Sequence, residues 1–243
     1  LVEQGLIDMA SIFPLLNSET LISSMTALVK KAETSKEVLL MMLSLADKYL
    51  YGTASPLYNE AAYRGLLQSA LISKALNKAD KEPYQKQLVI LEMNNEGSAA
   101  VDFDMQLVDG SKAKLSDIEA PVSILFFYAA DNLDCKLQRF RLTQARLVNY
   151  LQRAGGIKIV AVCVEGDKAA WEKFRADSPK EWLHVFDASG KIKSENLYDL
   201  RTLPRLYLLD EQKTVLLKNT KADDIEQYLV QIIQASDSVP AAE

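Results

Sequence analysis

The stretch FFYAADNLDCKLQR, residues 126–139, decides how this chain is interpreted. Its apolar start belongs to the run PVSILFFYA, which predicts a strand that is covered on both faces. A polar turn follows, and Asn132 precedes an expected helix, where asparagine is among the preferred capping residues. Cys135 lies three positions after Asn132, in the first turn. The stretch therefore predicts a buried strand that leads into a capped helix with one cysteine at its start.

The residues beyond this stretch predict an α/β domain. The helix that follows is expected to bury Leu137, Phe140, Leu147 and Leu151 on one side. Before the strand, Asp109-Gly110 marks a hairpin turn. The later elements are expected as a helix over 133–154, a strand over 157–166, a helix over 167–177, a hairpin over 205–218 and a helix over 222–232. Strand-helix-strand units imply right-handed crossovers and a parallel core, to which the last hairpin adds an antiparallel edge.

The first ninety or so residues have the apolar periodicity of helices instead. We expect these helices to begin at Asn17 or Ser18, at Thr34 with a capping box to Glu37, near Asn59, and after Asp80 with Pro83 in the first turn. Gly52 to Pro56 break the pattern between the second and third helices. We therefore divide the chain into a helical domain over residues 1–95, an α/β domain over 96–236 and a disordered tail over 237–243.

Composition narrows the classes of function. The 243 residues are 49% hydrophobic with a net charge of −5, which argues against nucleic-acid binding, since that usually needs a concentrated positive face. No apolar run approaches the roughly 20 residues that span a bilayer, so we expect membrane contact only through a removed lipid anchor. Two cysteines and one histidine are too few for a zinc site of four Cys or His ligands. We predict no metal and no cofactor.

The order of these pieces, with FFYAADNLDC at the first junction and RTLPRLYLLD at a later strand, resembles the thioredoxin superfamily. More narrowly, residues 97–232 resemble the TlpA-like thiol-disulfide oxidoreductases of bacterial envelopes. The opening AAVDFDMQLVDGSKAKLSDI and the stretch KIVAVCVEGDKAAWEKF support this resemblance. The helical half, with KYLYGTASPLYNEAAY, is similar to an uncharacterised helical domain found before such modules in exported proteins. The resemblance implies a thioredoxin-like mixed sheet flanked by helices after an all-α domain, in the periplasm or cell envelope.

The family's reaction uses two cysteines separated by two residues at the start of that helix. The first thiolate attacks, and the second resolves the mixed disulfide. Laid on this chain, the attacking position is Asn132 and the resolving position is Cys135, so the motif is degenerate. An amide cannot form a mixed disulfide. The acid that assists proton transfer in thioredoxins would fall near Phe126, which is a further departure.

The resemblance also implies a groove for a partner. Leu203-Pro204 falls where the family carries a cis-proline, and we expect Leu203, Pro204 and Tyr128 to line the groove, with Arg201 and Arg205 beside it. Such a groove can hold an extended peptide by strand addition. We therefore predict an exported protein that binds a protein or extended peptide; its oligomeric state stays open.

Several alternatives stay open at this point. The chain could be a divergent oxidoreductase that uses Cys135 alone or with Cys163, or it could act only as a scaffold. We favour both cysteines as buried, inert side chains, and a bond between them is the less favoured alternative. His184 is interpreted as a packed or hydrogen-bonded residue. The cations of the helix after Asn132 could attract an acidic partner, although a solvated face is the simpler interpretation: Lys136, Arg139, Arg141, Arg146 and Arg153.

Overall fold

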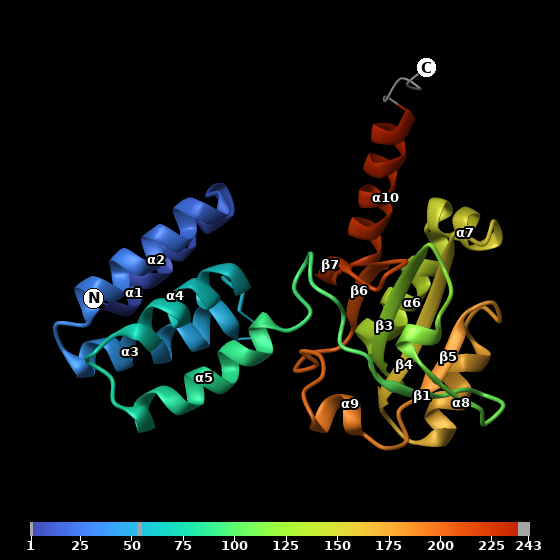
Figure 1. The fold of residues 1–243 in the computed structure, drawn as a ribbon, viewed down its shortest axis with the longest axis horizontal. Helices are drawn as coiled ribbons and strands as arrows, with labels where there is room; N and C mark the ends of the chain where they lie inside the picture. The colour runs from blue at the N-terminus through green and yellow to red at the C-terminus, as the bar shows by residue number, and fades with distance from the viewer. Residues whose placement is uncertain (1, 53–54, 238–243) are drawn as a thin grey trace. The chain divides into compact units, whose positions relative to one another are not determined.

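The computed structural model describes residues 2–52 and 55–237, and its chain forms two compact units, Leu1–Glu92 and Met93–Glu243 (Figure 1). Each unit has a separate hydrophobic core. Two predictions fall partly outside the described residues: the tail beyond 237 and the centre of the break between Gly52 and Pro56. Among the described residues, none of the helices combines the length and the apolar character needed to cross a membrane.

The first unit is entirely helical, as expected. Its elements are α1 (Val2–Ala10), η1 (Phe13–Leu15), α2 (Ser18–Ala32), α3 (Lys36–Ala46), η2 (Asp47–Tyr51), α4 (Glu60–Ile72) and α5 (Lys78–Glu92). Asn17 caps α2 by accepting a hydrogen bond from Thr20 N at 2.8 Å, and Asn59 caps α4 by accepting one from Ala62 N at 2.9 Å. These side chains satisfy backbone donors that the first turn of a helix leaves unpaired.

Two predicted helix starts in this unit are wrong by a few residues. Ser35, not Thr34, caps α3, because the hydroxyl of Thr34 donates back to the carbonyl of Lys31. The fourth helix starts at Lys78 rather than after Asp80, so Pro83 lies inside it. Asn77 and Asp80 each accept a hydrogen bond from the other's backbone N–H at 3.0 Å, which begins the helix earlier.

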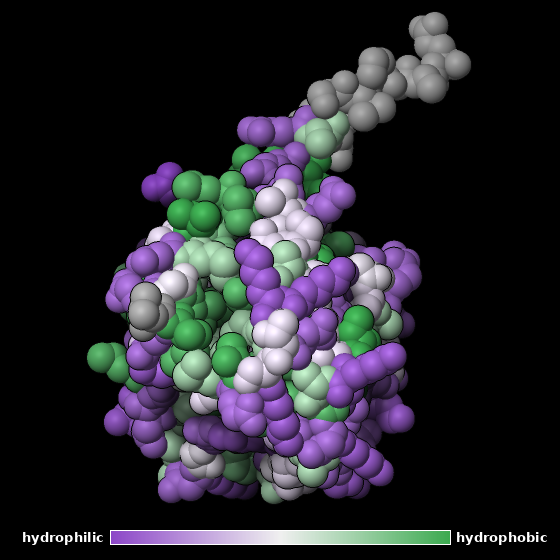
Figure 2. Space-filling view, turned by 90° about the vertical axis from the view of Figure 1, so that its left-hand side faces the viewer, coloured by the Kyte–Doolittle hydropathy of each residue, from purple (hydrophilic) through white to green (hydrophobic). Residues whose placement is uncertain are grey.

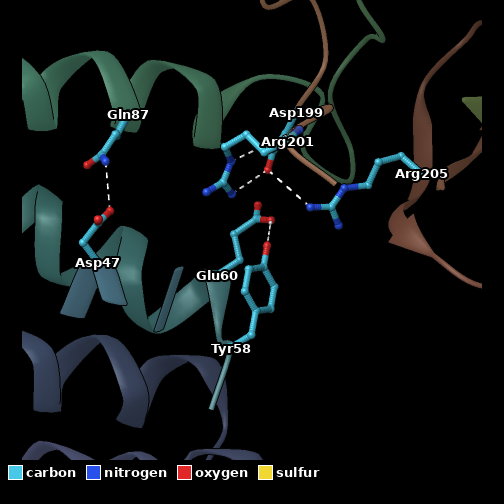
Figure 3. Close-up of polar contacts among 7 residues, drawn as sticks. All are labelled: Asp47, Tyr58, Glu60, Gln87, Asp199, Arg201 and Arg205. Carbon is cyan, nitrogen blue, oxygen red and sulfur yellow. Dashed lines mark hydrogen bonds and ion pairs between the residues drawn. The ribbon is translucent and has the colours of Figure 1, made fainter. Parts of the chain in front are cut away.

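A polar network supports the packing of this unit. Gln87 of α5 donates to Asp47 of η2 at 2.9 Å (Figure 3). The hydroxyl oxygen of Tyr63 lies 2.7 Å from Gln87 Oε1 and 3.0 Å from Asp47 Oδ1. Tyr63 stacks on Tyr51 with ring centroids 4.6 Å apart. Burial raises the pKa of Tyr63, and the carboxylate of Asp47 adds to that effect. The network therefore joins η2, α4 and α5 by polar contacts as well as apolar ones.

The surface of this unit mixes apolar and polar side chains. Leu15 and Ile72 are among its exposed hydrophobic residues. The face of the molecule seen in Figure 2 shows hydrophobic residues among hydrophilic ones. Scattered exposure of this kind is ordinary for folded proteins and by itself indicates no site.

The second unit contains a five-stranded sheet with the order β5-β4-β3-β6-β7. Its strands are β3 (Val122–Ala129), β4 (Ile157–Glu165), β5 (Leu183–Phe186), β6 (Arg205–Asp210) and β7 (Val215–Thr220). β3, β4 and β5 run parallel to one another, whereas β6 runs antiparallel to both of its neighbours, β3 and β7. A separate hairpin joins β1 (Asp104–Gln106) to β2 (Lys112–Lys114). The predicted mixed sheet and both predicted hairpins are confirmed.

The two faces of this sheet are covered by different elements. One face packs against α6 (Leu133–Gln144), α7 (Arg146–Arg153), α8 (Lys168–Ala176) and α10 (Ala222–Asp237). The other packs against the β1–β2 hairpin, η3 (Leu115–Asp117), α9 (Lys191–Ser194) and the chain before β6. The side chains of β3 from Ser123 to Tyr128 are buried accordingly. A continuous apolar run is what a strand covered on both faces requires.

A buried ion pair holds the chain that enters β6. The carboxylate of Asp199 accepts two hydrogen bonds from Arg201, at 2.8 and 2.9 Å, and lies 3.8 Å from the guanidinium of Arg205 (Figure 3). These arginines outweigh the burial of Asp199 and lower the pKa of its carboxyl group. The pair therefore stays ionised and fixes the segment that carries Leu203 and Pro204.

The expected single helix over 133–154 is two helices. The chain leaves helical geometry at Ala145, where φ is −68° and ψ is 102°. The carboxylate of Glu226 in α10 accepts a hydrogen bond from Leu147 N at 2.8 Å, and the amide of Asn149 donates to Thr143 O at 2.9 Å. The side chains of Glu226 and Asn149 thus bind backbone groups beside the break in place of intrahelical hydrogen bonds. The last helix also continues past the predicted end at Ile232, to Asp237.

Candidate functional site

The β3–α6 junction places Asn132 at the N-cap of α6. Its backbone is extended, with φ −75° and ψ 131°, and its side-chain oxygen accepts a hydrogen bond from Cys135 N at 3.0 Å. The geometry is that of an N-cap, in which the side chain binds a donor of the first turn. Asn132 is half-buried and carries no nucleophilic atom.

Cys135 lies on the inner side of the first turn and is completely buried. Its sulfur accepts a weak hydrogen bond from Ala129 N at 3.4 Å. Burial raises the pKa of the Cys135 thiol to about 12, and nearby acidic groups such as Asp134 act in the same direction. The thiol is therefore protonated at neutral pH, although a helix N-terminus would lower the pKa of an exposed cysteine.

Cys163 lies in β4, paired in register with Tyr128 of β3. Its thiol donates to the carbonyl of Glu165 at 3.2 Å, and burial raises its pKa to about 11. Both cysteines are free, so the alternative of a Cys135–Cys163 bond is not realised. Phe126, at the position where thioredoxins place an acid, packs among aromatic rings.

The predicted groove is present in part. The Leu203–Pro204 peptide bond is cis, and Pro204 lines a pocket of about 320 Å³ together with Leu137, Arg141 and Lys221. Leu203 is half-buried and packs against the cores on both faces of the sheet. Tyr128 does not line the groove. Its ring is completely buried and stacks on Phe174 of α8, with centroids 4.0 Å apart, because alternate residues of β3 face the helices.

The cations after Asn132 do not all lie on a solvated face. Arg139 is only 17% exposed; its guanidinium donates to Phe174 O at 3.0 Å and lies 4.5 Å from the centre of the Phe174 ring. Arg141 pairs with Asp223 of α10 at 3.1 Å. These two arginines join α6 to its neighbours, whereas Arg146 and Arg153 of α7 are exposed.

The outer side of α6 carries a feature that the sequence pattern did not reveal. Leu133, Leu137 and Phe140 are 79%, 46% and 60% exposed, although Leu137 and Phe140 were expected to be buried. The residues that α6 buries are Cys135 and Leu142. Leu133 and Phe140 are seven residues apart and share one side of the helix. Cys135 and Leu142 are also seven residues apart and share the opposite side. The series Cys135, Leu142, Ala145 and Val148 was the signal for the buried face.

The remaining candidates are structural. His184 lies in β5, where it is buried with a ring nitrogen 3.1 Å from Pro179 O, and burial lowers its pKa. Trp171 and Trp182 belong to the core. Over residues 2–52 and 55–237, no three His, Cys, Asp or Glu side chains are grouped as metal ligands would be.

Comparisons with known proteins agree with this architecture. Residues 1–94 match the model of a domain of unknown function, DUF5106, and residues 97–218 match the model of the AhpC/TSA family. A thioredoxin-like protein from Bacteroides caccae is 29% identical over 94% of this chain and 83% of its own, with a TM-score of 0.87. No protein with a curated description matches the chain.

Two further structures match the second unit. The C-terminal domain of an uncharacterised protein from Bacteroides fragilis is 35% identical over 56% of this chain and 98% of its own, with a TM-score of 0.55. The thioredoxin domain of a thiol-disulfide oxidoreductase from Bacteroides vulgatus has a TM-score of 0.51 over 57% of this chain and 98% of its own. At 18% identity, that likeness shows the thioredoxin-like fold alone. With its sheet, its flanking helices and the match over residues 97–218, this chain belongs to the AhpC/TSA family.

Proposed function

We propose that this chain is a thioredoxin-fold protein of the bacterial cell envelope that binds a protein or an extended peptide and does not catalyse dithiol exchange. The envelope location rests on the resemblance to exported modules. The observation that carries the proposal is the state of the site: an amide at the attacking position and, behind it, a completely buried thiol with a raised pKa.

The chemistry explains why this observation matters. Thiol-disulfide exchange begins when an accessible thiolate attacks a disulfide sulfur, and the rate depends on the fraction of thiolate and on access. Cys135 has neither property, because it is protonated at neutral pH and has no exposed surface. Asn132 stands nearer the surface, but its side chain binds the helix backbone.

The groove beside Pro204 supports the proposal that the chain binds a protein or an extended peptide. The pocket between Pro204 and Leu137 is open beside a strand terminus and contains apolar and charged groups. A partner segment that enters it would meet backbone groups at the start of β6 and side chains of α6. This is the arrangement in which main-chain contacts supply affinity and side-chain pockets supply selectivity.

A turbidity assay of insulin reduction tests the proposal. The wild-type chain is expected to give no turnover above the reductant alone, and Asn132→Cys is expected to gain turnover, because it places a thiol at the N-cap of α6. Cys135→Ser in the Asn132→Cys background is the matched control, since it removes the resolving thiol and leaves the new one. Turnover by the wild type that disappears in Cys135→Ser would contradict the proposal and would establish a divergent oxidoreductase.

A further inference from the structure

We propose that the outer side of α6 is a docking surface for an acidic segment that carries apolar side chains. This inference rests on the proposed binding function and names its partner by chemistry. The surface consists of Leu133, Leu137 and Phe140, which we call the α6 ridge.

The ridge is a continuous apolar strip on a regular helix. Its members are spaced by four and three residues, so they lie one above the other along one side of α6. The opposite side, with Cys135 and Leu142, fills the core, so the ridge faces away from the sheet. Three apolar side chains with exposures of 79%, 46% and 60% are thus neighbours on one helix side.

The ridge is continuous with the groove. Leu137 belongs to both, because it also lines the pocket that contains Pro204. A bound segment can therefore place one side chain in the pocket and lay others along Leu133 and Phe140. Anchoring of this kind, by a few apolar side chains on a helix face, is a recurring mode of peptide recognition.

The charge around the ridge selects an acidic occupant. The pocket is lined by three cations, Arg141, Arg205 and Lys221, and by one acid, Asp134, in a chain whose net charge is −5. Arg141 and Arg205 pair with Asp223 and Asp199, but in the described part of the chain no carboxylate pairs with Lys221 or with Lys136 of α6. An acidic segment gains from these charges, whereas a basic one is repelled.

Selection from a library of random linear peptides displayed on phage, with the full chain immobilised, tests this inference. We expect the selected peptides to be enriched in Asp and Glu together with Leu, Ile and Phe. Synthesised and labelled, they should bind in fluorescence anisotropy. The affinity should fall at least about tenfold for Leu137→Gln or Phe140→Gln, as expected for central anchors. It should fall several-fold for Lys136→Glu or Lys221→Glu, and less at high salt.

Matched controls come from the β1–β2 hairpin on the other face of the sheet. Val108→Gln removes an exposed apolar side chain, and Lys112→Glu reverses an exposed cation; neither should change the affinity. Circular dichroism of every variant establishes that the fold is retained, since all the substituted residues lie at the surface.

The outcomes separate this inference from the proposed function. Selected peptides that are neutral or basic, or that bind the ridge variants as well as the wild type, would overturn the acidic docking surface and leave peptide binding intact. A failure to enrich any peptide would overturn the acidic docking surface, and the proposed function would then be decided by the insulin turbidity assay. Displacement of the acidic peptides by a single-stranded DNA oligomer, or self-association in sedimentation velocity that Phe140→Gln abolishes, would assign the ridge to a different occupant and overturn the inference.

Discussion

The two sides of α6 differ in how far their apolar side chains are exposed. The inner side buries Cys135 and Leu142 completely, whereas the outer side leaves Leu133 79% and Phe140 60% exposed. Both sides are apolar, so hydrophobicity alone does not decide which one meets the sheet. The thiol of Cys135 lies on the side that solvent does not reach. The exposed side chains on the other side, which a partner could contact, carry no reactive atom.

The largest expected effect is on stability and contrasts the two sides directly. Leu142→Ala removes a buried side chain from the core that α6 shares with the sheet, and it should lower the free energy of unfolding by about 3 kcal/mol. Phe140→Ala removes a larger side chain from the outer side and should change it by less than about 0.5 kcal/mol. Urea unfolding followed by circular dichroism measures both. Equal losses would mean that the ridge is packed in solution and the contrast is wrong.

The second prediction concerns the thiol on the inner side. The folded chain holds the pKa of Cys135 above its ordinary value, so the buried neutral thiol contributes stability at neutral pH. That contribution is lost as the pH rises through the ordinary range of a cysteine towards about 12. Between about pH 8 and about pH 10 the loss should reach about 2 kcal/mol.

This prediction is tested by the difference in free energy of unfolding between two proteins, because buried tyrosines also titrate at high pH in both of them. The free energies of unfolding of the wild type and of Cys135→Ala are determined under reducing conditions across the range. The variant should lose less stability than the wild type as the pH rises. Cys163→Ala should behave similarly, since the pKa of Cys163 is also raised. Parallel curves for wild type and Cys135→Ala would show that folding leaves the pKa of this thiol unshifted, and so reopen its use in catalysis.

Much of this architecture could be predicted from the sequence, for identifiable reasons. The runs over 122–129 and 157–165 are apolar at nearly every position, which only strands covered on both faces require. Asn132 was recognised as a cap, Asn17 as one of two candidate caps and Asn59 as the approximate start of a helix, because a side-chain oxygen one residue before a helix has a local function. Such signals lie within a few residues of the element that they determine.

The wrong predictions concern helix ends and side-chain orientations that depend on residues far away in the sequence. The break at Ala145 is supported by Glu226, which lies in another helix and leaves no mark in the local pattern. Tyr128 was expected in the groove from the family resemblance, but the alternation of β3 directs its ring against Phe174 of α8. Leu137 and Phe140 were assigned inward because α6 has apolar residues on two sides, and only the packing of the sheet chooses between them.

The smallest effect lies at the boundary between the two sides, at Asn132. If Asn132 acts there only as a cap, Asn132→Ala should lower the free energy of unfolding by about 1 kcal/mol, because the N–H of Cys135 loses its acceptor. Asn132→Ser keeps an oxygen that can accept this hydrogen bond and should retain most of the stability. Thermal unfolding of the three proteins is sensitive enough to separate them. If Asn132→Ala were neutral, capping would not explain this residue, and the amide at the attacking position would need another role, such as a contact with the bound partner.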